Sequence, residues 1–307
     1  PEDRRKGMVQ KDMNKYMRAI GFQKYSIKDF ERMLLELGKH REYYRMGSNW
    51  QNERMFEICQ PVDGNRENAD MAGILWSGFE FQDELVCERC TPVAYSTYFA
   101  PRNLSVEEKI SGHEYTGAFE ETQTGVFIIF YLANAVEYLN HCKDGNAQNE
   151  SVFVALAGLS LKGTILFPVA KSRDGIERKQ KEQRYRIKLM AEAKKGNEKA
   201  MEQLAFQDMN IYTKVSRRIQ TEDVFTIVES SFMPYGTECE LYSIVADIVE
   251  TQKIKNIYTK ELIWKLLLNY NGILLPVYIN EQDLLGEPQA GRRFKGSFWL
   301  QGVVKFN

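Results

Sequence analysis

Residues that could do chemistry gather in a few short stretches of the sequence. Cys87 and Cys90 are separated by two residues, a spacing that contributes half of many structural zinc sites and forms some redox disulfides. Zinc usually needs about four such ligands, and the other cysteines are isolated: Cys59, Cys142 and Cys239. The motif also opens no helix of a thioredoxin-like unit. The sequence therefore favours two partly buried thiols over a metal or redox site.

An acidic stretch with one imidazole follows further along the chain. His113, Glu114 and Glu120 are candidate ligands of a divalent metal, because carboxylates and imidazole bind such ions or share a proton. Glu121 lies next to them. The alternative is that the two adjacent glutamates stabilise the start of the apolar segment after them, which we expect to be helical. We expect no bound cofactor, and the catalytic residues of any enzyme stay unassigned.

The most informative surface lies at the end of the chain, where residues 294–306 alternate without a break. Side chains on a strand point to opposite faces in turn, so one parity forms an aromatic core face and the other a basic face bearing Trp299. Barrels of the OB type bind single-stranded nucleic acid through cations and stacked aromatic rings. The candidate residues for binding nucleic acid or a protein partner are Arg217, Arg218, Arg292, Arg293, Lys295, Trp299 and Lys305. The alternative is a covered indole with a solvated rim of cations.

Several segments must position these residues. Residues 1–12 resemble an extension, native or added, and residues 13–170 predict a mixed α+β domain. Within it we expect a helix capped by Ser26, short strands between 54 and 100, and a core helix over 125–142. We also expect a hairpin of residues 152–157 with 164–169. From 171 to 220 there are 14 Lys/Arg against 7 Asp/Glu, in a pattern that predicts a basic helical hairpin.

The remaining segment, residues 221–307, predicts three strands, a short helix capped by Asn280 and the final strand. This order is typical of an OB-like β-barrel domain. Residues 259–268 also fit an amphipathic helix, and Pro276 restricts its strand to an edge or a bulge. The predicted fold class is thus α+β, with an N-terminal mixed α/β domain, a basic helical hairpin and a C-terminal OB-like β-barrel domain.

Composition limits the function classes. The 307 residues carry a formal net charge of −1, which predicts no strong affinity for nucleic acid as a whole. The longest apolar run is far shorter than the roughly 20 residues of a bilayer span. Five unevenly spaced cysteines indicate a reducing compartment. We expect a cytoplasmic protein with no membrane partner, in an oligomeric state that the sequence leaves open.

Short motifs spread over the chain resemble a family of clostridial (Lachnospiraceae-type) bacteria, catalogued as domain of unknown function 3881. The motifs that carry the resemblance are MRAIGF at 17–22, EYTGAFEE at 114–121, GLSLKGT at 158–164, SRRIQ at 216–220, FMPYG at 232–236 and GRRFKG at 291–296. The resemblance implies a bacterial cytoplasmic protein and assigns no activity to any residue.

Phosphate-binding loops, dinucleotide fingerprints and nucleophile elbows do not occur in the sequence. With only three histidines, general acid–base chemistry would depend on carboxylates. The sequence therefore favours a non-enzymatic binding or adaptor protein over an enzyme. A metal-dependent enzyme using the His/Glu stretch and a homo-oligomeric structural protein are the alternatives.

Overall fold

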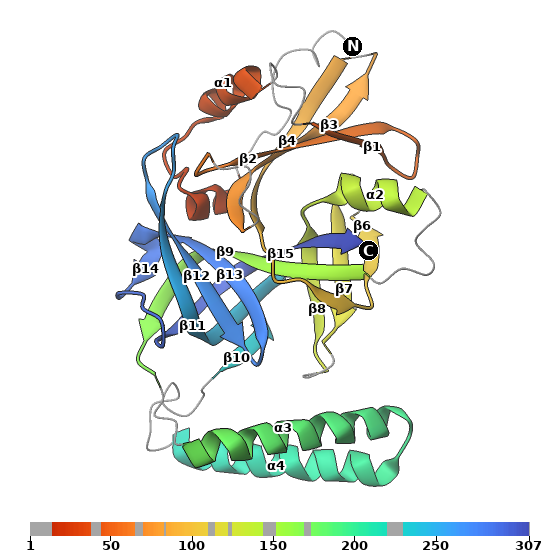
Figure 1. The fold of residues 1–307 in the computed structure, drawn as a ribbon, viewed down its shortest axis with the longest axis vertical. Helices are drawn as coiled ribbons and strands as arrows, with labels where there is room; N and C mark the ends of the chain where they lie inside the picture. Colours follow the sequence, from red (N-terminus) through yellow and green to blue (C-terminus); the bar gives the residue numbers. More distant parts are fainter. Residues whose placement is uncertain are drawn as a thin grey trace.

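The protein is a mixed α+β structure built around a large sheet (Figure 1). The computed structural model describes residues 14–37, 44–64, 70–82, 84–109, 114–121, 125–143, 152–168, 173–219 and 230–306. Within the helices, the side chains of residues 173–180, 183, 214–215 and 217–219 lie outside this description. The predicted extension at 1–12 and His113 lie outside it as well.

A four-stranded antiparallel sheet forms the upper layer in Figure 1, in the order β1-β2-β3-β4. Its strands are β1 (Arg45–Ser48), β2 (Arg54–Pro61), β3 (Met71–Phe81) and β4 (Glu84–Tyr95). The 3₁₀ helix η2 (Lys15–Ile20) and the helix α1 (Ile27–Leu37) precede it. The helix α1 begins after Ser26 as predicted, and the Asp29 half of a capping box is present: the Ser26 backbone N–H and hydroxyl both donate to the Asp29 carboxylate.

The larger sheet has eleven strands, which come from residues 100–306. Its strands are β5 (Ala100–Arg102), β6 (Ser105–Glu108), β7 (Tyr115–Glu120), β8 (Phe127–Leu132), β9 (Val152–Leu166), β10 (Ser231–Pro234), β11 (Leu241–Lys255), β12 (Leu262–Tyr270), β13 (Ile273–Asn280), β14 (Leu284–Leu285) and β15 (Arg293–Phe306). Along the main path the order is β10-β11-β12-β13-β9-β15-β8-β7-β6, and β11 also pairs with β15. Strand pairing followed from β11 through β12, β13, β9 and β15 therefore leads back to β11.

Two predicted elements are wrong. The helix expected over 125–142 is the strand β8 followed by the shorter helix α2 (Ala135–Lys143). A short run that is apolar on both faces suits a buried strand as well as a buried helix, so periodicity could not separate them. The hairpin expected at 152–169 is the single strand β9. Gly163 does not turn the chain; it makes room for the ring of Phe294, which would lie 2.3 Å from an added Cβ.

The C-terminal elements follow the sequence closely. Residues 262–270 form the strand β12 rather than an amphipathic helix. Pro276 pairs with β12 only, because pairing with β9 begins at Val277, so its missing N–H costs no ladder bond there. Asn280 caps the 3₁₀ helix η5 (Glu281–Asp283), its side chain accepting from the Gln282 backbone N–H. β9 belongs to the predicted N-terminal domain, but it lies between β13 and β15 of the predicted C-terminal domain. Backbone pairing therefore crosses the domain boundary expected at residue 170.

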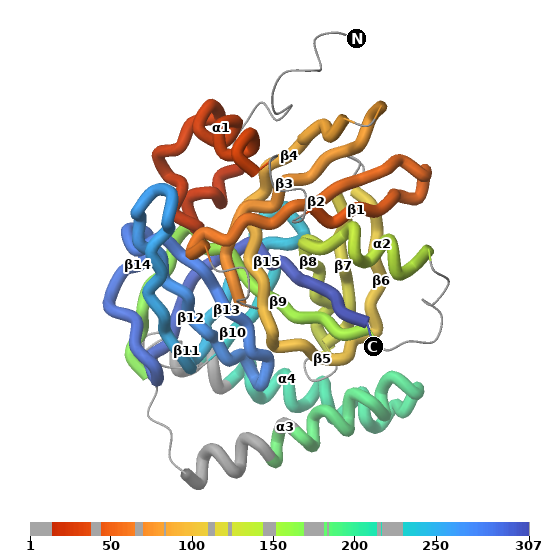
Figure 2. Tube along the Cα trace, turned by 45° about the horizontal axis from the view of Figure 1, so that its top comes forward, coloured from red at the N-terminus to blue at the C-terminus, as the bar shows by residue number. Residues whose placement is uncertain are grey.

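The basic segment forms the predicted helical hairpin of α3 (Arg173–Lys194) and α4 (Glu198–Ile219), joined at Gly196 with φ +85°. Figures 1 and 2 show the two helices side by side below the large sheet. The hairpin contacts the sheet near the β7–β8 turn, where Lys194 forms an ion pair with Glu120. Among the helices that the structure describes, none has the length and apolarity to cross a membrane.

Candidate functional site

The final strand, β15, is covered on both faces. The predicted aromatic core parity is confirmed: Phe294, Phe298 and Leu300 are buried in one cluster. Trp299 belongs to the opposite parity, but it is only 8% exposed and lies in a second cluster. Its ring lies 5.4 Å from that of Tyr16 and 5.0 Å from that of Tyr131, centroid to centroid. The expectation that this indole is open to solvent is wrong, because η2 and β8 cover it.

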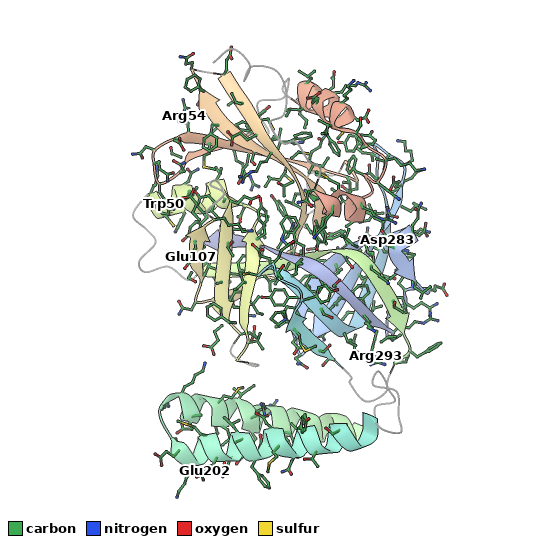
Figure 3. The ribbon with its side chains drawn as sticks, turned by 180° about the vertical axis from the view of Figure 1, so that it is seen from behind. Trp50, Arg54, Glu107, Glu202, Asp283 and Arg293 are labelled. Atoms are coloured by element: carbon green, nitrogen blue, oxygen red, sulfur yellow. The ribbon has the colours of Figure 1, made fainter. Side chains whose placement is uncertain are left out.

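The basic residues near β15 do not gather into a groove. Arg293 is buried and donates from Nε to the carbonyl oxygen of Phe167 at 2.9 Å (Figure 3). Arg292 donates to the carbonyl oxygen of Glu287 at 2.7 Å. Lys295 is partly exposed and Lys305 exposed, ten residues apart on one strand, or about 33 Å. The side chains of the other two candidates, Arg217 and Arg218, lie outside the described residues.

The candidate metal ligands are separated. Glu114 comes just before β7, and Glu120 is the last residue of that strand. The first pairs with Arg89 at 3.4 Å and the second with Lys194. Across the described ranges, which do not include His113, no group of three His, Cys, Asp or Glu side chains could hold a metal ion.

The two cysteines of the CxxC motif are buried in β4. Cys87 donates weakly to the carbonyl oxygens of Ser77 and Arg89, at 3.7 and 3.4 Å. Burial raises the pKa of Cys87 to about 12 and raises that of Cys90 well above its ordinary value. Both thiols are therefore protonated at neutral pH, whereas nucleophiles and metal ligands need the thiolate. All five cysteines of the chain are free thiols.

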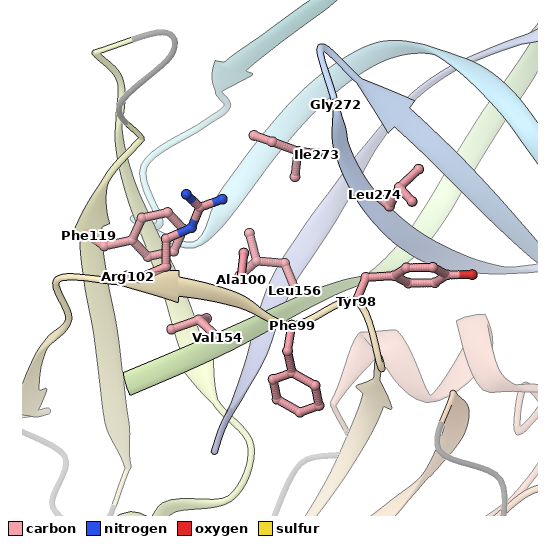
Figure 4. Close-up of a pocket in the computed structure, with 10 residues that line it drawn as sticks. All are labelled: Tyr98, Phe99, Ala100, Arg102, Phe119, Val154, Leu156, Gly272, Ile273 and Leu274. Atoms are coloured by element: carbon pink, nitrogen blue, oxygen red, sulfur yellow. The ribbon is translucent and has the colours of Figure 1, made fainter. Parts of the chain in front are cut away.

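A pocket of about 220 Å³ lies where the β4–β5 connection, β5, β7, β9 and the β12–β13 turn meet (Figure 4). Its walls are mostly apolar and aromatic. The lining residues are Tyr98, Phe99, Ala100, Arg102, Phe119, Val154, Leu156, Gly272, Ile273 and Leu274. No pattern in the sequence points to this site, since its residues come from four separate segments that only the sheet brings together.

Arg102 is the charged residue of the pocket lining, and it is held in place from two sides. Its Nη2 lies 2.8 Å from Oε2 of Glu121, a carboxylate that is only 1% exposed. Its guanidinium carbon lies 5.0 Å from the centre of the Phe119 ring. A guanidinium placed over an aromatic face and paired with a buried carboxylate has little freedom to reorient. Glu121, predicted as part of an acidic cluster, thus orients a pocket residue.

The opposite end of the pocket carries a phenol. Tyr98 lies away from Arg102 in Figure 4. Its pKa is raised, first by burial and then by the negative charges of Asp70 and Glu250. The phenol is therefore protonated at neutral pH and can donate a hydrogen bond. The pocket thus has a protonated phenol at one end and a guanidinium at the other.

Comparison with known proteins places the chain in one family. No curated protein is similar to it at a significant level, and no solved structure is either. The profile of a family described as a domain of unknown function, E. rectale gene description (DUF3881), matches residues 17–302, which is most of the chain. The chain therefore belongs to this family of unknown function, as its motifs predicted.

Proposed function

We propose that this chain is a non-enzymatic binding protein of the bacterial cytoplasm and that the pocket beside Arg102 receives its ligand. The observation that carries the proposal is the lining, in which apolar and aromatic walls surround one oriented guanidinium. Pockets of this kind, largely apolar with a few fixed polar groups, are typical of small-molecule sites. The buried thiols and separated carboxylates support binding over catalysis.

The chemistry of the lining suggests the class of ligand. A guanidinium has five N–H donors, more than its contact with Glu121 uses, so Arg102 can also donate to a ligand oxygen. Val154, Leu156 and Ile273 offer apolar contact. The ligand is therefore a small molecule with an apolar body and a carboxylate.

An OB-like barrel is our proposal for the part of the fold that supports this pocket. Barrels of this type have five strands in a partly open Greek-key arrangement. The pairings among β11, β12, β13, β9 and β15, which return to β11, support it. In this arrangement β9, which precedes the helical hairpin in the sequence, supplies the fifth strand. Residues 221–307 therefore do not form the barrel alone.

Two observations weigh against single-stranded nucleic acid as the ligand. Stacking on Trp299 needs an accessible ring, and this ring is packed between Tyr16 and Tyr131. The cations on and just before β15 are spread along the strand or bonded to backbone carbonyls. Both observations favour the pocket over the basic strand as the place where a ligand binds.

Thermal unfolding with small aryl and alkyl carboxylates tests the proposal. Phenylacetate, 3-phenylpropionate and octanoate would be added to the whole protein, each beside its neutral amide. A ligand at ten times its dissociation constant stabilises the folded state by about 1.4 kcal/mol, which is a measurable rise in melting temperature. We expect a rise with at least one carboxylate and a smaller rise with its amide, because Arg102 recognises the anion.

A variant that fills the pocket supplies the control. Ile273→Trp places a large ring at the lining, whereas Leu285→Trp adds the same ring at a position that is 71% exposed on β14. We expect the first variant to lose the ligand-dependent rise and the second to keep it. Equal responses in both variants, or no response to any probe in the unmodified protein, would reject the pocket. Salt-sensitive binding of labelled single-stranded RNA that Ile273→Trp leaves intact would favour nucleic acid instead.

A further inference from the structure

The outer side of α4 is an apolar surface that the rest of the protein leaves uncovered. Phe206 is 61% exposed, Met209 60% and Tyr212 75%, and Met201 is exposed beside them. In Figure 3 the labelled Glu202 lies on the side of α4 away from the sheets. Because 3.6 residues complete a turn, Glu198, Glu202, Ala205, Met209, Tyr212 and Ser216 follow one stripe at alternating spacings of four and three.

The inner side of the same helix is already paired with α3. The Tyr185 hydroxyl donates to Oε1 of Gln203 at 3.1 Å, and Arg186 forms an ion pair with Asp208 at 2.8 Å. Leu189 of α3 and Ala200 of α4 are buried. The contacts of the hairpin with the sheet also come from α3, through Lys194 and, near Gly125, Met190. Among the described side chains, the stripe from Glu198 to Tyr212 is exposed and therefore takes part in neither interface.

We propose that this stripe binds the same stripe of a second copy, with the two α4 helices antiparallel. This goes beyond the ligand pocket and does not depend on it. A two-fold axis near residue 207 places Ala205 of one copy beside Met209 of the other, so that a small side chain faces a large one. The same axis places Tyr212 beside the partner's Glu202, where its phenol can donate to the carboxylate. Ser216 then lies beside the partner's Glu198.

The stripe is self-complementary in size, and the two halves of the helix as a whole differ in charge. By sequence, the first half of α4, residues 198–208, has three acidic residues and one basic, and the second half, residues 209–219, has three basic residues and none acidic. An antiparallel arrangement brings unlike halves together. It also opposes the two helix dipoles, which attract in this orientation. A parallel dimer would place acidic beside acidic at one end.

The available area predicts a reversible dimer. Aromatic side chains bury about 150–250 Å² each, so the exposed parts of Phe206, Tyr212 and the two methionines amount to roughly 400–500 Å² per copy. A dimer would then bury roughly 800–1,000 Å² in total, at the small end of specific interfaces. We therefore expect a dissociation constant in the micromolar range rather than an obligate dimer.

Sedimentation of the whole protein over a range of concentrations is the first test. Met209→Glu introduces a charge at the centre of the stripe and should raise the dimer dissociation constant at least tenfold. Leu35→Glu is the matched control, since Leu35 is 73% exposed on α1 and its replacement should leave association unchanged. Far-ultraviolet circular dichroism checks that both variants keep their helices. A monomer even at millimolar concentration, or a dimer that Met209→Glu leaves intact, would overturn the proposal.

Cysteine cross-linking tests the antiparallel orientation. In a Cys239→Ser background, which removes the exposed native thiol, Glu202→Cys and Tyr212→Cys are made as separate proteins. In a dimer of either variant alone, the two introduced thiols lie about 15 Å apart along the helix axis. In a mixed dimer, the thiol at position 202 lies beside the thiol at position 212 of the other copy. A disulfide needs Cα atoms within about 7 Å, so only the mixed dimer can form one. We expect oxidation to link the mixture and neither protein alone. Linking of each variant with itself, or of no combination, contradicts the arrangement.

Discussion

The side chain of Gln301 pairs with the backbone groups on either side of Val93 as another peptide group would. Its Oε1 accepts from the Ala94 backbone N–H at 2.7 Å, and its Nε2 donates to the carbonyl oxygen of Pro92 at 2.9 Å. β4 is the edge strand of the four-stranded sheet, so these two backbone groups point away from β3. A fully buried amide on β15 therefore satisfies the edge of one sheet from the centre of the other.

Replacing Gln301 by Leu should destabilise the protein by about 2–4 kcal/mol, because two buried backbone groups lose their partners. Chemical denaturation followed by tryptophan fluorescence measures this change. Gln252→Leu is the control, since Gln252 is exposed on β11 and its replacement should change the free energy of unfolding by less than about 0.5 kcal/mol. Similar effects of the two substitutions would show that the bonds to β4 contribute little.

Trp299→Ala should cost about 3–5 kcal/mol of stability, since it leaves a cavity between Tyr16 and Tyr131. Trp299→Phe should cost less, because most of the ring volume remains. Trp50 offers a comparison, as it is 52% exposed and its replacement by Ala should be nearly neutral. Thermal and denaturant unfolding give the values, and a neutral Trp299→Ala would be incompatible with a packed indole.

Glu57 should make stability depend on pH. Burial raises its pKa to about 7, while the backbone N–H groups of Val136 and Ala135, with the charge of Arg45, partly offset that effect. An acid whose pKa is higher in the folded state binds more protons when folded. Its contribution is complete below the ordinary value of 4.5, falls as pH rises to about 7, and then stays lost.

A comparison of the unmodified protein with Glu57→Gln over that pH range isolates this effect. The unmodified protein should lose about 3 kcal/mol relative to the variant between pH 4.5 and 7.5, because an amide does not ionise. Denaturant unfolding at several pH values measures the difference. If the two free energies of unfolding stay parallel across the range, the carboxyl does not titrate with a raised pKa.

Removing one member of the Arg102–Glu121 pair should destabilise the protein more than removing both. Arg102→Met leaves a buried carboxylate without its cation and should cost about 3–5 kcal/mol, whereas adding Glu121→Leu to it should recover much of that loss. An exposed pair provides the reference: Lys15→Met breaks the contact with Glu238, where both side chains are more than half exposed, and should cost at most about 1 kcal/mol. A double-mutant cycle on unfolding free energies measures the coupling. A loss that the double variant does not recover would contradict this account.

The sequence alone determined the elements whose signals are local. The Ser26–Asp29 cap, the joint at Gly196 and the alternation after Phe294 each depend on neighbours within a few residues, and each lies in the expected helix, hairpin or strand. The family also follows from the sequence, because its motifs are runs of adjacent residues.

Only the tertiary structure decided what covers each face. Alternation placed Trp299 opposite the core parity, but it could not show that Tyr16 and Tyr131, far away in the chain, would close over it. The sequence of β9 likewise predicts a hairpin, and only the packing of Phe294 against Gly163 explains why a glycine lies within a continuous strand. The pocket at Arg102 depends on contacts between distant segments. Such contacts leave no period in the sequence, because burial depends on which elements meet and not on the order of residues within one of them.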